Sequence, residues 1–274
     1  MWGNKFLPAL GLAVALAGFG LFKKVEEETE NAYEKGQELV ANQKYVDLNK
    51  LSEVARVSCN GLPLAAYFYR LAQDYNLPPQ VIAIIPRESS GNPYATGCDP
   101  CGGSGGARLA LSRQWIQISQ NIGLCKGGGV CSIGYGLMQI TSHTLEEYRR
   151  AEKINLTPYA LLNSRIFYFR SNPSAIRDEP PQSPYNVCSN IQVGLLILRD
   201  KYKSCGGEGI SRIACAVCRY NGNPKYLKAL RETISKGGTG ILVKLGFLKD
   251  DAVDIVKDFV VKIAGFFGFS VNRC

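Results

Sequence analysis

One short stretch, residues 81–93 with the sequence VIAIIPRESSGNP, constrains the fold of this chain more than any other. Its apolar run follows Pro78 and Pro79, which suit a helix start because a proline at the first helical position lacks an N–H that would have no partner there. Ser-Ser-Gly-Asn-Pro ends the run and is a turn signal. The pattern therefore predicts a short buried helix with Glu88 near its C-terminal end.

A carboxyl group in that position has two reasons to keep its proton. The C-terminal end of a helix carries partial negative charge, which disfavours an ionised carboxylate. Apolar neighbours also withhold the solvation that the charged form needs, so we expect a raised pKa for Glu88 and a group able to act as a general acid. The competing interpretation is a solvated glutamate at a helix end, the usual fate of a lone acidic residue.

Pro86 lies two residues before Glu88 and removes a backbone hydrogen bond to Ile82 if the helix already includes both residues. Two outcomes stay open at this point. Either the helix begins late in the run, or the proline kinks it and aims Glu88.

Further motifs follow Glu88 along the chain, and they are Gly136-Leu137-Met138-Gln139-Ile140, Asn190-Ile191 with Gly194, and Tyr220-Asn221-Gly222. Glu-Ser-x-x-Asn-Pro, Gly-Leu-Met-Gln, Asn-Ile-x-x-Gly and Tyr-Asn in this order resemble the lytic transglycosylase family with its goose-lysozyme-like fold. Each motif is weak alone, but the order of the set is specific. The resemblance extends over roughly residues 62–230.

The resemblance implies a mainly α, lysozyme-like helical domain with Glu88 as its catalytic acid. It also implies that the Tyr220 hydroxyl approaches Glu88 across a cleft, and that substrate contacts come from Ser89, Gly136, Leu137, Met138, Gln139 and Asn221. As residue types, a glycine lets backbone approach a sugar ring, a methionine offers an adaptable apolar contact, and a glutamine offers a donor and an acceptor. For Leu137, packing on the core is the simpler interpretation.

Ordinary glycosidases place two carboxylates across the scissile bond. No second acid accompanies these motifs, because Asp99 and Glu179 fall in apparent insertions. The resemblance implies that Glu88 alone cleaves the β-1,4 bond between N-acetylmuramic acid and N-acetylglucosamine in peptidoglycan, leaving 1,6-anhydro ends and needing no cofactor or metal. Two alternatives stay open, namely a lysozyme-type hydrolase of the same bond and a catalytically silent wall-binding component of a virion or secretion system.

Residues 6–22 are apolar and uncharged, with Lys5 before them and two lysines after them. Their length is at the short limit for a membrane span and also suits the core of a signal peptide. We favour a retained anchor over residues 1–24, with the enzyme facing the periplasm or extracytoplasmic space, and virion association also remains open. The charged segment 25–58 is predicted to be a helical stalk that holds a catalytic domain at residues 59–235 off the membrane.

The chain has ten cysteines, and two Cys-x-x-Cys pairs, at 98–101 and 215–218, have a spacing seen in zinc sites. With an export-like N-terminus, disulfides are the favoured interpretation and no metal site is predicted. Four cysteines lie in a long insertion between Glu88 and Gly136, and residues 156–183 form a second insertion. The pairing cannot be read from sequence.

The C-terminal segment, residues 236–274, lies outside the resemblance and contains a strongly amphipathic helix over residues 252–267. The simpler interpretation packs its apolar stripe on the domain, and the alternative is a contact with a protein partner. Its acidic polar face disfavours anionic lipid. The net charge of +9 favours an acidic partner such as peptidoglycan, whereas the scattered basic residues and the lack of a motif argue against nucleic acid. His143 is read as structural.

Overall fold

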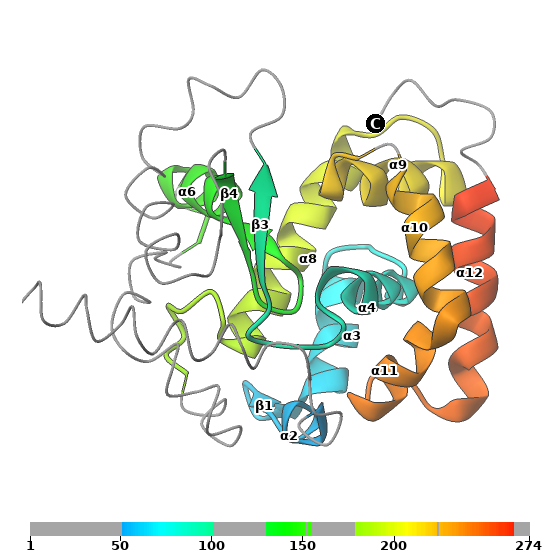
Figure 1. Ribbon diagram of the computed structural model, residues 1–274, viewed down its shortest axis with the longest axis horizontal. Coiled ribbons are helices and arrows are strands. Elements are labelled where there is room, and N and C mark those ends of the chain that lie inside the picture. The colour runs from blue at the N-terminus through cyan, green and yellow to red at the C-terminus, as the bar shows by residue number, and fades with distance from the viewer. Residues whose placement is uncertain (1–50, 101–129, 152, 155–178, 224, 266–274) are drawn as a thin grey trace, which may run out of the picture.

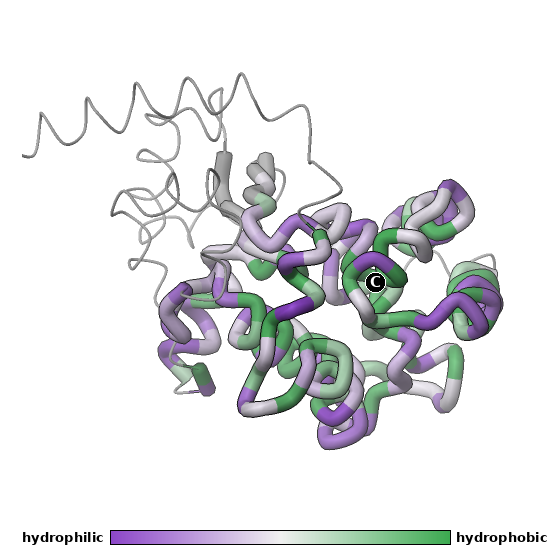
Figure 2. The backbone as a smooth tube through the Cα atoms, turned by 90° about the horizontal axis from the view of Figure 1, so that it is seen from below, coloured by the Kyte–Doolittle hydropathy of each residue, from purple (hydrophilic) through white to green (hydrophobic). Residues whose placement is uncertain are grey.

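The computed structural model describes residues 51–100, 130–151, 153–154, 179–223 and 225–265. Helices dominate these residues, which confirms the mainly α prediction. In Figure 1 the sheet and α6 lie on one side of the molecule, α12 lies on the other side, and α3 and α4 lie between them. Figure 2 shows the same chain from below, with hydrophobic and hydrophilic residues alternating along the helical segments as expected of amphipathic helices.

The helical elements are α2 Leu51–Ala55, α3 Leu64–Asp74, η2 Pro79–Ala83, α4 Ile84–Ser89, α6 Ser142–Arg150, α8 Val187–Ser204, α9 Gly209–Asn221, α10 Tyr226–Thr233, η6 Ile234–Gly238, α11 Thr239–Lys244, η7 Asp250–Ala252 and α12 Val253–Gly265. The strands are β1 Ser58–Cys59, β2 Leu62–Pro63, β3 Thr96–Pro100, β4 Val130–Tyr135 and β5 Ile140–Thr141.

Helix α3 contributes one amphipathic face to the core. Its buried face includes Leu64, Phe68 and Leu71, and the exposed fraction of Phe68 is 0%. The Phe68 ring packs edge to face on Phe247, with ring centroids 5.6 Å apart. A residue from the C-terminal third of the chain therefore completes the core around the first helix.

A small antiparallel sheet, which the sequence did not predict, adjoins the helices. Strands β3 and β4 pair from Thr96↔Tyr135 to Pro100↔Val130, and β5 pairs with the end of β4. The Cys-rich insertion thus connects two paired strands, and residues 101–129 of it lie outside the described residues. The second insertion also lies mostly outside them.

Two disulfides fix α8 at both ends. Cys59 on β1 is bonded to Cys188 in the first turn of α8, across a sequence separation of 129. Cys205, just after α8, is bonded to Cys215 on α9. Cys218 is disulfide-bonded as well, so neither member of the 215–218 pair is available to bind zinc, and the disulfide interpretation of that pair is confirmed.

The hydrophobic core includes residues on both sides of the predicted segment 59–235. Leu51, Val54 and Val57 are buried, although they belong to the segment predicted as a stalk. On the C-terminal side, Leu242 and Phe247 join the same core cluster. The core therefore takes apolar residues from short helices that have no family motif, and the domain boundaries stay a prediction.

The apolar stripe of α12 packs on the domain. Val256, Phe259, Val260 and Ile263 are buried, and the helix contacts α9 and α10. This outcome is the simpler of the two interpretations, and these four side chains are not available to a protein partner. Among the described helices, none has the length and hydropathy to cross a membrane. The predicted anchor at residues 6–22 and most of the predicted stalk lie outside the described residues.

Candidate active site

Glu88 lies next to the last residue of α4, as the apolar run predicted. The preceding turn, η2, is a separate 3₁₀ helix that begins at Pro79. Pro86 is therefore the third residue of α4. The first N–H groups of a helix have no acceptor within the helix, so a proline at this position costs no hydrogen bond. Of the two outcomes left open by the sequence, the structure shows the late helix start.

The turn after α4 is held tightly against α11. Ser90 and Gly91 both have positive φ, +53° and +79°. A Cβ added to Gly91 would lie 2.8 Å from the Ile241 side chain, so this position has room only for glycine. The predicted substrate contact Ser89 is buried, accepts from the Gly91 N–H at 3.2 Å and donates to the Ile85 carbonyl at 3.2 Å. Its hydroxyl therefore closes the helix end that presents Glu88.

The Glu88 side chain is half-buried, and its Oε1 atom is shielded from solvent. Burial, followed by the charge of the Glu88 carboxylate, raises the pKa of Tyr220 well above its ordinary value. Burial, Glu88 charge and hydrogen bonding with Glu88 raise the pKa of Tyr226 in the same direction. The carboxyl group is thus flanked by two phenols that remain protonated.

Tyr220 lies near the end of α9, beside Gly222, where the helix stops in a left-handed turn. Its hydroxyl donates to the Met138 carbonyl at 2.7 Å. The proton of Tyr220 therefore ties α9 to the Gly136–Gln139 turn, and the Glu88 charge acts on its pKa. The predicted approach of its hydroxyl to Glu88 across a cleft stays a prediction. Asn221, the neighbouring predicted substrate contact, is exposed and is available to a ligand.

The Gly136–Gln139 turn packs its apolar side chains into the core. Leu137 and Met138 each have an exposed fraction of 0%, which for Leu137 is the simpler of the two interpretations. Substrate contact by residues of this turn stays a prediction. The Gln139 amide nitrogen donates to the Ala95 carbonyl at 3.0 Å and to the Gly136 carbonyl at 2.9 Å. Gln139 has φ +48°, a backbone conformation that is uncommon outside glycine and that this amide helps to hold.

Two glycines allow the turn to pack. A Cβ on Gly136 would lie 2.5 Å from the Asn190 amide nitrogen, so this glycine allows Asn190 to approach the turn closely. A Cβ on Gly194 would lie 2.7 Å from Met138 side-chain atoms. The Asn-Ile-x-x-Gly motif on α8 therefore contacts the Gly-Leu-Met-Gln turn directly.

Asn190 is the residue that holds this turn, a role that the sequence analysis did not assign. It is fully buried, and its Oδ1 accepts from the Met138 N–H at 2.8 Å. Its Nδ2 donates to the Tyr135 carbonyl at 2.9 Å and to the Pro184 carbonyl at 2.8 Å. Since Met138 also accepts from Tyr220, Asn190 fixes the residue that positions the phenol next to Glu88.

We expect Asn190→Asp to lower the free energy of unfolding by about 2–4 kcal/mol near neutral pH. The Asn190 amide donates to two carbonyl oxygens, whereas a carboxylate at this position would place a negatively charged oxygen against them. This environment raises the pKa of the introduced carboxyl in the folded state above its unfolded value. The free energy of unfolding of the variant should therefore rise as the pH falls from neutral toward about 4, because the introduced carboxyl takes up a proton. Urea unfolding of the variant and of the wild-type protein at both pH values measures the difference in free energy.

Asn223→Asp is the matched control, because Asn223 is exposed and its Oδ1 accepts from the Lys225 N–H, a role that a carboxylate can keep. It should change the free energy of unfolding by less than about 0.5 kcal/mol. Equal costs for the two variants would show that Asn190 does not hold the turn.

Tyr226 is the second functional residue that sequence reasoning missed. It is the first residue of α10, which packs against α4, and its exposed fraction is 3%. The sequence shows it only as one of the apolar positions at helical spacing with Leu227 and Leu230. No signal along the chain connected Tyr226 with Glu88.

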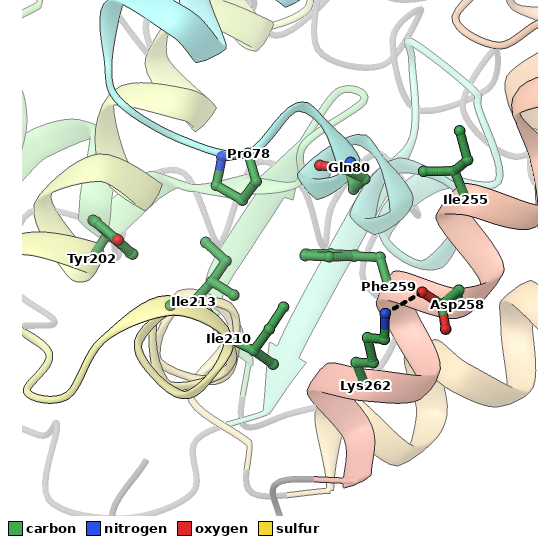
Figure 3. Close-up of a pocket in the computed structure, with 10 residues that line it drawn as sticks. Pro78, Gln80, Tyr202, Ile210, Ile213, Ile255, Asp258, Phe259 and Lys262 are labelled. Atoms are coloured by element: carbon green, nitrogen blue, oxygen red, sulfur yellow. Dashed lines mark ion pairs between the residues drawn. The ribbon is translucent and has the colours of Figure 1, made fainter.

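A cavity of about 400 Å³ lies elsewhere, between α12, the N-terminal end of α9 and the start of η2 (Figure 3). Figure 3 shows Ile210, Ile213 and Phe259 pointing into it, with the Asp258–Lys262 ion pair at one side. None of the predicted site residues lines this cavity. It is therefore separate from the Glu88 site.

The described residues contain no group of three or more His, Cys, Asp or Glu side chains that could hold an ion. Asp99 lies on β3, and Glu179 is buried near the start of the 179–223 segment. Glu88 is the carboxylate that acts on both phenols.

Comparison with known families agrees with the motif order. Residues 66–166 match the family model described as the transglycosylase SLT domain, a range that includes Glu88 and the Gly136–Gln139 turn. Asn190, Tyr220 and Tyr226 lie beyond the matched range. Searches of curated proteins and of solved structures gave no match. The resemblance to lytic transglycosylases is thereby confirmed for residues 66–166, which are similar to the transglycosylase SLT domain and make up less than half of the chain.

Proposed function

We propose that this protein is a peptidoglycan lytic transglycosylase that cleaves the β-1,4 bond between N-acetylmuramic acid and N-acetylglucosamine with Glu88 as its single acid and base. The matched domain supports action on peptidoglycan in general. The observation that carries the specific proposal is the half-buried Glu88 at the end of α4, flanked by Tyr220 and Tyr226.

A single carboxyl group suffices if the substrate supplies the second group. The protonated Glu88 gives its proton to the glycosidic oxygen as the bond to the muramyl C1 breaks. The 2-N-acetyl oxygen of the same sugar forms a bond to C1 and holds the positive charge. Glu88, now a carboxylate, takes the proton of the muramyl 6-hydroxyl while that oxygen attacks C1 and displaces the acetamido oxygen. Glu88 ends protonated and no water is consumed.

The surroundings of Glu88 suit both halves of this cycle. One carboxylate oxygen is shielded, which favours the protonated state that begins the reaction. The side chain is still half-exposed, so a sugar oxygen has access to it. Exposed Asn221 is the substrate contact that remains from the predicted set, whereas Ser89, Leu137, Met138 and Gln139 support the site from within.

The product identifies the reaction. Digestion of purified peptidoglycan by the wild-type protein should release muropeptides with 1,6-anhydromuramyl ends, each lighter by one water than the corresponding reducing-end product. Mass spectrometry of the soluble fraction distinguishes the two. Reducing ends would instead indicate a lysozyme-type hydrolase, and no release of muropeptides would indicate a wall-binding component.

We also propose that the protein acts outside the cytoplasm and is held at a membrane by residues 6–22. Disulfides such as Cys59–Cys188 persist in oxidising compartments, which supports an extracytoplasmic location. The apolar run of residues 6–22 and its flanking lysines support the anchor. Fractionation of cells that produce the full-length chain, with and without residues 1–24, would place the protein.

A further inference from the structure

The two phenols beside Glu88 differ in where their protons point. The Tyr220 hydroxyl donates to the Met138 carbonyl at 2.7 Å, and the Met138 N–H is in turn fixed by Asn190. A phenol whose proton is already donated can offer only its oxygen lone pairs to a third group. Tyr220 therefore has no proton to offer to Glu88.

Tyr226 has the opposite character. Its hydroxyl oxygen is buried and makes no hydrogen bond of ordinary length within the described part of the chain. Glu88 is the acidic group beside this phenol, and the contact between the two side chains is longer or less well aligned than an ordinary hydrogen bond. Hydrogen bonds at catalytic groups are often long before substrate binds and shorten in the complex. The proton of Tyr226 is thus available to a carboxylate at position 88.

From this geometry, which we interpret on the basis of the proposed function, we propose that Tyr226 is a positioning residue that donates to the Glu88 carboxylate. Helix α10, which begins with Tyr226, packs against α4, which presents Glu88. A single-residue mechanism needs both forms of Glu88 in turn, and Tyr226 stabilises the carboxylate form.

Tyr226 acts in this role as a donor and not as a base. Its burial and the neighbouring Glu88 charge raise its pKa well above the ordinary value, so the phenol keeps its proton throughout. Tyr226 is also buried at the start of α10, so it does not touch the substrate. It acts on the reaction only through Glu88.

Tyr226→Phe should therefore disfavour the Glu88 carboxylate. A hydrogen bond to the charged form lowers a carboxyl pKa, so its loss should move the Glu88 titration midpoint upward by about one pH unit. The kcat for wall cleavage should fall about tenfold, because the carboxylate forms in the transition state of the first step. KM should change little, because the phenol does not touch the sugar.

The midpoint can be read without relying on activity. Carbon-13 NMR of protein labelled at the glutamate side-chain carboxyls follows each group through the pH range, and Glu88→Gln identifies the signal of position 88. Tyr220→Phe should not move the midpoint upward, because the Tyr220 proton is donated to the Met138 carbonyl and not to Glu88. An unchanged midpoint in Tyr226→Phe, or an equal upward shift in Tyr220→Phe, would overturn the proposal.

Tyr135→Phe is the matched control. Tyr135 is equally buried at 3% exposure, and burial and Tyr185 raise its pKa, with no contribution from Glu88. It should leave the Glu88 midpoint unchanged. If Tyr226→Phe unfolds, 3-fluorotyrosine placed at position 226 keeps the ring, is a stronger donor and should move the midpoint downward, and an unchanged midpoint would again overturn the proposal.

The failure of this proposal is distinguishable from the failure of the proposed function. A wild-type protein that releases no muropeptides would refute the function, while the titration would still report whether Tyr226 and Glu88 are coupled. Anhydro products together with a Tyr226→Phe midpoint equal to that of wild type would refute only the role of Tyr226.

Discussion

Glu88→Gln is expected to reduce the release of muropeptides at least about 1,000-fold, because one carboxyl group performs both the acid and the base step. Glutamine has nearly the same shape, so it keeps the packing of the half-buried side chain at the end of α4. It can neither give a proton to the glycosidic oxygen nor accept one from the 6-hydroxyl. The measurement is the initial rate of muropeptide release by equal amounts of folded protein.

Glu208→Gln is the control for this loss. Glu208 is the residue before α9, and it has the same carboxyl group but is exposed. The Glu208→Gln variant should cleave peptidoglycan at the wild-type rate, and both variants should show the wild-type circular dichroism spectrum. Substantial cleavage by Glu88→Gln would mean that another group performs the reaction.

The largest expected effect on stability comes from the Cys59–Cys188 disulfide. Its removal by Cys59→Ala together with Cys188→Ala should lower the free energy of unfolding by about 4–5 kcal/mol, since the bond closes a loop with a sequence separation of 129. The bond also fixes β1 against the first turn of α8, the turn that contains Asn190. Guanidinium unfolding at neutral pH measures the difference.

The Cys205–Cys215 bond supplies the comparison within the same molecule. Its sequence separation is 10, so removing it by the same alanine pair should cost less than about 3 kcal/mol. The ordering of the two costs is the prediction, and equal or reversed costs would contradict it. A strong dependence of stability on the long-range bond would also support folding in an oxidising compartment.

Local patterns were sufficient for the helices that carry the site. The apolar run before Glu88 predicted a short helix ending near it, and α4 ends at Ser89. Gly222 follows the Tyr220-Asn221 motif and ends α9 in a left-handed turn, so this helix end also agrees with the local sequence. Helical periodicity and turn residues are local properties, so they can be read from neighbouring positions.

The partners of polar side chains could not be read in this way. Gln139 was predicted to bind sugar, but its amide donates to the backbone at Ala95 and Gly136. Met138 was predicted to contact substrate, but it fills the space left by Gly194. A sequence shows which groups can form hydrogen bonds, whereas tertiary packing decides which groups they meet.

The same reasoning explains Tyr226 and the domain boundaries. Tyr226 has the spacing of a core residue, and only the packing of α10 on α4 brings it to Glu88. Leu51 and Val54 lie in a highly charged region of the sequence, but they are buried in the core of the domain. The strands on either side of residues 101–129 pair across a long connection, which local periodicity does not reveal.

The origin of the oxygen atoms in the products tests the central claim most directly. Peptidoglycan is digested with the wild-type protein in water enriched in heavy oxygen, and the released muropeptides are weighed by mass spectrometry. Intramolecular attack by the muramyl 6-hydroxyl, with Glu88 as the only acid and base, predicts anhydro products that contain no heavy oxygen. Incorporation of one heavy oxygen atom at each new reducing end would show that water is the nucleophile and would contradict this account.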